Sequence, residues 1–403
     1  MAPTSPIERK HFCLTIAIAV FLFTMLVYRS ASPVAYNVFN SQCDCRSSEE
    51  PECITVCKKI TSVFLPKLYD HGLNQTATPA SAAVTTTTPP HPVIPNLGEC
   101  DACLAGKSLV TVNKGWLCGQ ARIGNKMFMM APAIAAAAKL NRTFVLPQDG
   151  GSCDWIDMLK EFFISVSSTV PLLPEKSFKD WEVFGEGGFT HFSPIEPDSN
   201  QNISIGGYRQ SWKYFNSSSQ ASALRETFRF NKKYDSAAVH SLESAKSALK
   251  IQQPIFVGVH MRIGDLKDKD RLNYGYQMAN QSFYLNALEA AKTCLNQSES
   301  IIFIVASDTL KDAKEMLSPA EKLYNIVWLH GSAYEDFATL SYCNHSIISG
   351  GTYGFWTAWL AGGETFYFSN FSKPGTNFHK GFIASNFYLP QWRPVGWSKY
   401  VFQ

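Results

Sequence analysis

The chain has 403 residues, of which 45% are hydrophobic and 17% are charged, so it can bury a large core and is long enough for two domains. Its formal net charge of +3 is small for this length and gives no argument for nucleic acid as a partner, and we predict none.

The N-terminal segment contains an apolar run, Phe12 to Tyr28, that no charged residue interrupts. Its length lies at the short end of membrane-spanning helices and suits the thin membranes of the early secretory pathway. The flanking charges favour a cytoplasmic N-terminus by a small margin. We therefore predict a cytoplasmic tail (1–11), a transmembrane signal-anchor (12–28) and a lumenal remainder. A signal peptide cleaved near Ala31 is the alternative.

Cysteine usage also indicates a lumenal chain. Ten of the eleven cysteines follow the apolar run, and an even number suits disulfides in an oxidising compartment. Some are spaced like zinc ligands, but disulfides are favoured in a lumenal segment. The ten are Cys43, Cys45, Cys53, Cys57, Cys100, Cys103, Cys118, Cys153, Cys294 and Cys343.

Eight N-glycosylation sequons support the same compartment, because so many in this length are not expected by chance. We do not expect all eight to be occupied, since two of them flank the region in which a ligand is expected. They are Asn74, Asn141, Asn202, Asn216, Asn280, Asn296, Asn344 and Asn370.

Residues 29–107 are expected to form a lumenal stem. The stretch 74–95 is rich in Thr, Ala and Pro and shows no apolar periodicity, which is typical of a flexible, O-glycosylated linker. The cysteine-bearing piece 43–57 before it predicts either a small clasp or an intermolecular disulfide that links two chains. A folded domain is expected from about Ser108.

From there the pattern alternates between short apolar strands and amphipathic or Ala-rich helices. This alternation predicts an α/β fold with parallel sheets covered on both faces. It restarts near residue 251, so we predict two halves, 108–250 on the acceptor side and 251–403 on the donor side, with an irregular aromatic stretch at 150–215. Expected strands are 109–112, 143–146, 255–259, 301–306, 326–329, 346–349 and 365–368, and expected helices are 131–140, 221–230, 236–249, 282–294, 310–316, 334–343 and one from Tyr353.

Two segments predict a ligand site. In the first, an apolar run ends in Ser349-Gly-Gly-Thr352 and passes directly into a helix. Backbone N–H groups of Gly351 and Thr352 would then lie at a helix N-terminus, which is a ready phosphate site. In the second, a strand runs straight into His260, Arg262 and Asp265, and the carboxyl ends of strands are where open α/β sheets bind ligands.

The residue types of the second segment suit transfer to a hydroxyl group. Arg262 presents a planar fork that can bind a phosphate bidentately, and His260 or Asp265 could accept a proton from an acceptor hydroxyl. An ion pair between Arg262 and Asp265 that holds the loop explains the same residues equally well.

Weaker candidates follow two other strands. Ser307 could bond a phosphate or ribose and Asp308 ribose hydroxyls or a base, although a helix N-cap is the simpler explanation. The segment from Gln120 to Asn125 is typical of a strand-to-helix turn, and its backbone could approach a ligand. Asp268-Lys-Asp270 matches a D-x-D metal-binding pattern, but it lies in a charge-mixed run that is typical of solvated surface, and we assign no metal.

Four segments together resemble the galactoside α-1,2-fucosyltransferases (glycosyltransferase family 11), in that family's order from about Ser108 to the C-terminus. They are QARIGNKMFMMAPAIAAAAKLN, GVHMRIGD, FIVASD and FATLSYCNHSIISGGTYGFWTAWLAGGETFYFSNF. The resemblance implies two Rossmann-like halves (GT-B type) with the active site between them, GDP-fucose as donor, inversion at the anomeric carbon, no required metal or cofactor, and a Golgi type II membrane protein.

By the same resemblance, Arg262 falls on the arginine that binds the donor diphosphate. The turn facing it from the first half matches Arg122, Gly124 and Asn125, and the donor-side turn matches Ser349, Thr352 and Phe355. The family usually has a second arginine where this chain has Ile263.

The sequence thus predicts transfer of fucose to the 2-hydroxyl of terminal galactose on glycans of glycoproteins or glycolipids. Two alternatives remain. One is another lumenal glycosyltransferase with a metal at Asp268 and Asp270, and the other is a non-catalytic, membrane-anchored glycan-binding protein.

Overall fold

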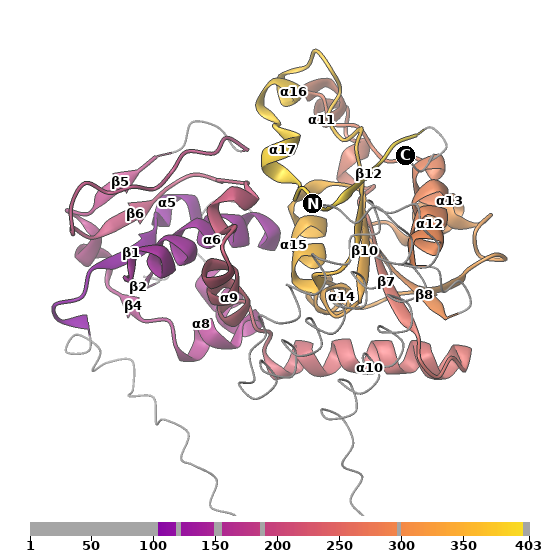
Figure 1. Ribbon diagram of the computed structural model, residues 1–403, viewed down its shortest axis with the longest axis horizontal. Coiled ribbons are helices and arrows are strands. Elements are labelled where there is room, and N and C mark those ends of the chain that lie inside the picture. The colour runs from indigo at the N-terminus through magenta and orange to yellow at the C-terminus, as the bar shows by residue number, and fades with distance from the viewer. Residues whose placement is uncertain (1–103, 118–121, 149–154, 186–189, 296–299, 398–403) are drawn as a thin grey trace, which may run out of the picture. The chain divides into compact units, whose positions relative to one another are not determined.

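The computed structural model describes residues 104–117, 122–148, 155–185, 190–295 and 300–397 (Figure 1). The predicted tail, signal-anchor and nearly all of the stem lie outside these residues, as do Asn74, Asn296 and eight of the ten cysteines. None of the helices in the described ranges combines the length and the apolar character that a bilayer span requires. The membrane topology therefore stays a prediction.

The first half contains a parallel sheet with the strand order β2-β1-β6-β5. Its strands are β1 (Leu109–Val112), β2 (Thr143–Phe144), β5 (Glu182–Phe184) and β6 (Ile203–Ile205). The predicted strand 143–146 is in fact divided, because after β2 the chain continues into β3 (Leu146–Pro147), which pairs with β4 (Leu172–Leu173) instead.

The long helix of this half is α6 (Ile123–Leu140), which starts well before the predicted Ala131. Pro132 inside it would ordinarily signal a break. The helix is buried on nearly all sides, so packing compensates for the lost hydrogen bond. The other helical segments are α5 (Lys114–Leu117), α7 (Trp155–Phe162), α8 (Ile164–Ser168), η2 (Glu175–Phe178), η3 (Trp212–Phe215) and α9 (Ser218–Thr227). The stretch 150–215 is thus more regular than predicted, and β6 within it pairs with both β1 and β5.

The second half contains a six-stranded parallel sheet with the order β12-β11-β10-β7-β8-β9. Its strands are β7 (Ile255–Met261), β8 (Ile301–Ser307), β9 (Asn325–Trp328), β10 (His345–Ile348), β11 (Thr365–Phe368) and β12 (Arg393–Val395). From β7 the chain adds strands on one side and then, from β10 on, on the other. This is the doubly wound order, and the direction reverses between β7 and β10.

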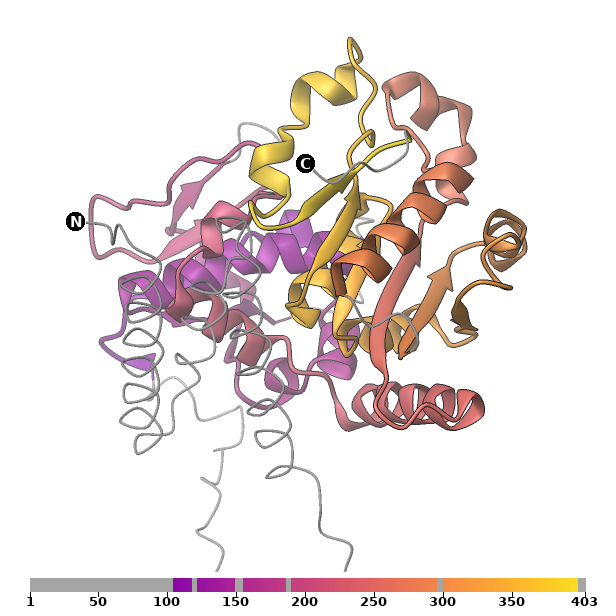
Figure 2. The same ribbon diagram turned by 45° about the vertical axis from the view of Figure 1, so that its right-hand side comes forward.

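Helices cover both faces of this sheet (Figures 1 and 2). Successive side chains of β8 point to opposite faces, and each set packs against different helices. Ile301, Phe303 and Val305 belong to the same core cluster as Phe283 of α12 (Gln281–Leu295). Their neighbours Ile302, Ile304 and Ala306 pack instead with residues of α14 (Ala333–Ser341) and α10 (Lys232–Leu249). The remaining segments are η4 (Asp265–Lys267), α11 (Lys269–Tyr274), α13 (Leu310–Leu317), α15 (Gly351–Ala361), α16 (Asn377–Gly381) and α17 (Ala384–Phe387).

Aromatic side chains pack the two halves together. Phe128 of α6 lies 4.6 Å from Phe355 and 4.9 Å from Trp356 of α15, measured between ring centroids. Arg225 of α9 donates to the last carbonyls of α15 and lies over the Trp359 ring. The predicted α/β class with parallel sheets is confirmed, whereas the GT-B type stays a prediction.

Candidate active site

The two segments singled out from the sequence meet at the reversal point of the second sheet. His260 on β7 pairs with Ile348 on β10, so Arg262 and the turn from Ser349 to Gly351 leave the same edge side by side. Ligands of open α/β folds bind at the carboxyl ends of strands where the strand order reverses. The sheet therefore brings the predicted residues to the expected place.

Two glycines form the turn from β10 into α15. Both have positive φ, 110° at Gly350 and 80° at Gly351, which side chains rarely adopt. A Cβ on Gly350 would collide with the Phe371 ring, and one on Gly351 would lie 2.6 Å from Nη1 of Arg262. The second glycine thus lets the guanidinium group approach the first turn of α15.

Ser349 joins the two strand ends. It is fully buried, and its Oγ donates to the His260 carbonyl at 3.0 Å and accepts from the Arg262 amide at 2.8 Å. Because both bonds are to backbone, the hydroxyl fixes the geometry of the turn. A direct contact between Ser349 and a donor stays a prediction.

Arg262 forms the ion pair that the sequence allowed as an alternative. Its Nε and Nη2 donate to the two carboxylate oxygens of Asp265 at 2.9 and 2.8 Å. Nη1 has no hydrogen-bond partner among the described residues and faces Gly351. The pair therefore holds the guanidinium plane in place while leaving one of its nitrogens for a ligand.

Further arginines act on the same carboxylate. Arg271 Nε lies 3.5 Å from Asp265, and the charge of Arg122, at the N-terminus of α6, also reaches it. Burial by itself would raise the pKa of Asp265, but Arg262 and the other two arginines hold the pKa below its ordinary value. Asp308 adds a second carboxylate near Arg262. Three guanidinium groups against two carboxylates leave a positive charge, as an anion site requires.

His260 lies beneath this site. It is almost fully buried, and its ring stacks on Tyr353 with centroids 4.8 Å apart. Nδ1 has no hydrogen-bond partner in the described part of the chain, and a Cβ on Gly354 would lie 2.7 Å from it. Burial lowers the pKa of His260 to about 4, although the charge of Asp308 acts in the opposite direction. The imidazole is therefore neutral and weakly basic near neutral pH.

Asp308 organises the loop after β7. Its Oδ1 accepts from the amides of Ile263 and Gly264 at 2.9 and 3.1 Å. The N-cap of α13 is Thr309, so the N-cap explanation offered for Asp308 is wrong. Ser307 Oγ accepts from the Thr309 amide at 3.1 Å. Both side chains thus support loops at the site edge, and their contact with a nucleotide stays a prediction.

The N-termini of α6 and α15 lie against each other. A Cβ on Gly124 would lie 2.6 Å from the Thr352 carbonyl carbon, so only glycine allows the backbones this close. Asn125 Oδ1 accepts from Thr352 Oγ1 at 2.8 Å and from Gln210 Nε2 at 3.2 Å. Two positive helix ends therefore converge near Arg262, one from each half.

One prediction needs correction. Phe355 is fully buried among aromatic rings of α6, η3 and α17, so in this structure it packs the core and does not line the site. Ile263 is also fully buried, in the main core cluster. Its side chain thus points away from the charged groups around Arg262.

The D-x-D triplet lies on the surface, as expected. Asp268 is the N-cap of α11 and its Oδ1 accepts from the Asp270 amide at 2.8 Å. Both carboxylates are exposed. The described ranges contain no group of three His, Cys, Asp or Glu side chains that could hold a metal ion. Metal independence itself stays a prediction.

The two described cysteines of the predicted lumenal set differ in burial. Cys343 carries a free, buried thiol whose pKa is raised by burial, so the even cysteine count does not translate into complete pairing. Cys294 is half-buried on α12. Of the described sequons, Asn141, Asn216, Asn280 and Asn344 are exposed and Asn202 and Asn370 are half-buried.

Sequence reasoning missed three residues of the site. Gln210 lies in the stretch 150–215, where no periodicity marked it. Arg271 ends the run taken for solvated surface, and the Tyr276 ring lies 5.8 Å from the Arg262 guanidinium. Tyr276 also borders a pocket of about 320 Å³ beside the charged cluster.

Comparisons with known proteins bear on this arrangement. The model of "Glycosyl transferase family 11" matches residues 191–395, slightly more than half of the chain. "Galactoside alpha-(1,2)-fucosyltransferase 1" from Bos taurus is 30% identical over 193 residues, which are 47% of this chain and 52% of the relative. The protein of the same name from Saimiri boliviensis boliviensis is 28% identical over 291 residues, 67% of this chain and 72% of the relative. The chain thus spans about half the length of the bovine relative.

Among solved structures, NodZ alpha-1,6-fucosyltransferase soaked with GDP-fucose matches with 13% identity and a TM-score of 0.39, covering 65% of this chain and 95% of that one. POFUT1 in complex with GDP matches with 13% identity and a TM-score of 0.34, covering 65% and 99%. Likenesses this weak carry no argument about function. The matched family segment includes β7, β10 and the glycine turn that build the charged site, and we conclude that the chain belongs to glycosyl transferase family 11.

Proposed function

We propose that this chain transfers fucose from GDP-fucose to the 2-hydroxyl of a terminal galactose. The observation that carries the proposal is the convergence of Arg262 with the N-termini of α6 and α15 at the reversal point of the second sheet. Membership of the family supports glycosyl transfer, and the names of the relatives supply the sugar and linkage.

The donor diphosphate accounts for the positive charge. As the bond to fucose breaks, negative charge grows on the diphosphate and must be stabilised. Nη1 of Arg262, the exposed Arg122 and the first amides of α15 supply donors without a metal. Asp265 orients Arg262 in this scheme, which explains a carboxylate bonded through both oxygens.

Inversion requires the acceptor hydroxyl to attack from the face opposite the diphosphate. Of the two candidate bases, Asp265 is bonded to Arg262 and His260 is buried, so neither is placed as a strong base. A transition state with oxocarbenium character forms much of its charge before the proton leaves and needs little help from a base. We therefore assign Asp265 and His260 primarily to positioning the groups of the site, and only secondarily to proton transfer.

Aromatic rings at the carboxyl edge of the first sheet suit the acceptor sugar. Trp116, which follows β1, is 41% exposed and lies 5.4 Å from the Tyr208 ring, which follows β6. Tyr208 is two residues from Gln210, which bonds Asn125 at the junction of the halves. A galactose on these rings would lie beside the donor site.

We also propose a Golgi type II protein with a lumenal catalytic domain and no cofactor, in which stem cysteines could link two chains. The sequons and the apolar run support this location. Removing N-glycans enzymatically from the expressed full chain should lower its apparent mass, and an unchanged mass would exclude a lumenal catalytic domain.

A transfer assay tests the function. The purified full chain is incubated with labelled GDP-fucose and a panel of glycans that end in galactose, in 2-O-methylgalactose or in N-acetylglucosamine. We expect labelled product with free galactose termini alone. Transfer to another sugar would show that galactose is not the acceptor. No turnover with any acceptor would favour the non-catalytic, glycan-binding alternative.

A further inference from the structure

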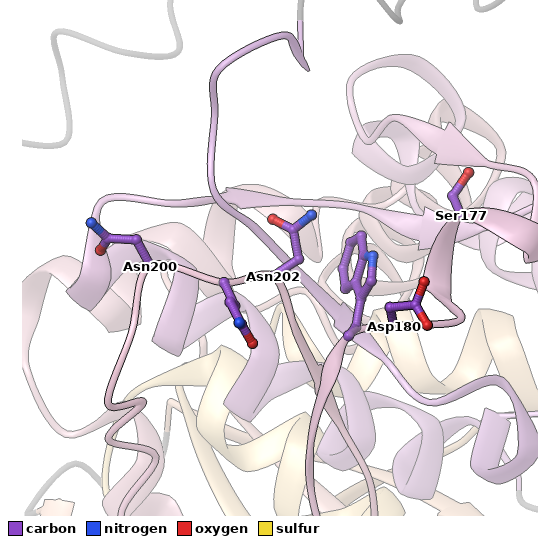
Figure 3. A pocket seen from close by; sticks show the side chains of 6 residues that line it. Ser177, Asp180, Asn200 and Asn202 are labelled. Carbon is purple, nitrogen blue, oxygen red and sulfur yellow. The ribbon is translucent and has the colours of Figure 1, made fainter.

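A pocket of about 440 Å³ opens on the first half (Figure 3). Its volume falls within the roughly 300–1,000 Å³ of small-molecule sites. It lies where the chain enters β5 and β6, whereas Tyr208 and Gln210 follow the opposite, carboxyl end of β6. The pocket is therefore separate from the candidate active site. Its lining residues are Ser177, Asp180, Trp181, Asn200, Gln201 and Asn202.

The lining suits a sugar. Trp181 is half-buried, and its indole packs edge-on against Phe178 with centroids 4.7 Å apart, which fixes the ring. The other lining residues supply a hydroxyl, a carboxylate and amides. A sugar has an apolar C–H face that packs on an aromatic ring and hydroxyls that need donors and acceptors.

One lining residue is itself a glycosylation sequon, Asn202-Ile203-Ser204. Asn202 Oδ1 accepts from the Leu109 amide at 2.8 Å, and Leu109 begins β1, which borders β6 on one side. On the other side, the Glu182 amide, one residue after Trp181, donates to the Asn202 carbonyl at 3.0 Å. With the amide oxygen held toward β1, the amide nitrogen is turned toward β5. In Figure 3 this nitrogen faces the side on which Ser177 and Asp180 lie.

We propose that the pocket holds the first sugar of an N-glycan attached to Asn202, an N-acetylhexosamine whose ring packs on Trp181. An attached sugar has a high effective concentration at the pocket, so an open site suffices to hold it. The sugar would fasten the entry of β5 to β6 and stabilise the first sheet. This rests on the proposed lumenal location and is independent of the transferase activity.

The first experiment separates the sugar from the asparagine. Ser204→Ala removes the sequon while Asn202 keeps its bond to Leu109, and Ser204→Thr preserves the sequon as a matched control. In a host that N-glycosylates, we expect Tm of the full chain to be about 2–4 °C lower in Ser204→Ala than in Ser204→Thr, which keeps the sequon at this buried position. Ser218→Ala, which removes the exposed Asn216 sequon, should not shift Tm.

A double-mutant cycle tests whether the sugar packs on the Trp181 indole. Trp181→Ala should lower Tm, and adding Ser204→Ala to it should lower Tm no further, because both changes remove one contact. Additive shifts would overturn the proposal, as would mass spectrometry showing Asn202 without a glycan.

Trimming the unaltered chain decides the question even where Trp181→Ala fails to fold. An enzyme that leaves only the first sugar should keep Tm, whereas one that removes the whole glycan and leaves aspartate at position 202 should lower Tm of the unaltered chain more than Tm of Ser204→Ala. Equal Tm after both treatments would contradict the proposal. If a free galactose-terminated oligosaccharide changes the tryptophan fluorescence of the fully glycosylated chain and Trp181→Ala abolishes that change, the pocket is an acceptor subsite and the proposal is wrong.

Discussion

Arg262 owes its role to two neighbours that the sequence places far apart. Asp265 fixes the plane of its guanidinium group, and Gly351, on another strand end, leaves room for Nη1. A side chain held on one edge by a carboxylate and open on the other is prepared for an anion, because little conformational freedom is left to lose on binding.

We expect Arg262→Lys to reduce kcat/KM at least about tenfold, since each charge-assisted hydrogen bond contributes about 1.5–3 kcal/mol and lysine cannot supply the fork. Arg393→Lys is the matched control. Arg393 begins β12 and pairs with Glu364, and its change to lysine should retain activity. Steady-state kinetics with a thermal melt checks both. Wild-type turnover in Arg262→Lys would make Arg262 a purely structural residue.

His260 predicts a pH dependence of stability. Its pKa is about 4 in the folded protein and about 6.5 when unfolded, so between these values the unfolded chain binds more protons. This contribution is complete above pH 6.5 and is lost as the pH falls toward 4, by up to about 3 kcal/mol in the free energy of unfolding.

Denaturant titrations at several pH values should show that His260→Gln removes this part of the acid destabilisation. The exposed His240, changed to Gln, serves as control and should leave the pH profile unchanged. A His260→Gln profile that parallels the wild type would show that other groups cause the acid loss.

At the scale of elements, the contact between α6 and α15 decides how the halves meet. Gly124→Ala would place a methyl group 2.6 Å from the backbone of Thr352. We expect a loss of about 1–3 kcal/mol of stability from overpacking, together with reduced turnover, because Asn125 would separate from Thr352. Gly185→Ala, at a glycine with open space around it, should be neutral in the same melts and assays. A neutral Gly124→Ala would mean that the helix ends can separate without consequence.

At the scale of the whole molecule, the charge of the site bears on metal use. The cluster around Arg262 already offers cations to a diphosphate, and the Asp268 carboxylate caps α11. Turnover should therefore survive EDTA, and Asp270→Ala should retain activity. Loss of activity with EDTA and its recovery with manganese would move the site to Asp268 and Asp270.

Much of the fold could be predicted from sequence because it is encoded locally. Strands such as β7 and β8 are continuous apolar runs, and helices such as α10 and α12 repeat apolar residues at helical spacing. The alternation of strands with helices along the chain predicted parallel sheets. Errors occurred where tertiary packing overrides local preference: α6 continues through Pro132, and β6 is a three-residue strand whose pairing with β1 and β5 no short-range pattern reveals.

The sequence by itself determined the family, the class of fold and the residues that end β7 and β10, because motif residues and apolar periodicity are properties of short segments. Only the tertiary structure decided which of those residues touch. It paired Arg262 with Asp265, buried Phe355 and His260, and brought Gln210, Asn125 and Thr352 into one hydrogen-bonded chain. The physical reason is that burial and hydrogen-bond partners depend on strand order and helix packing, which join residues more than two hundred positions apart.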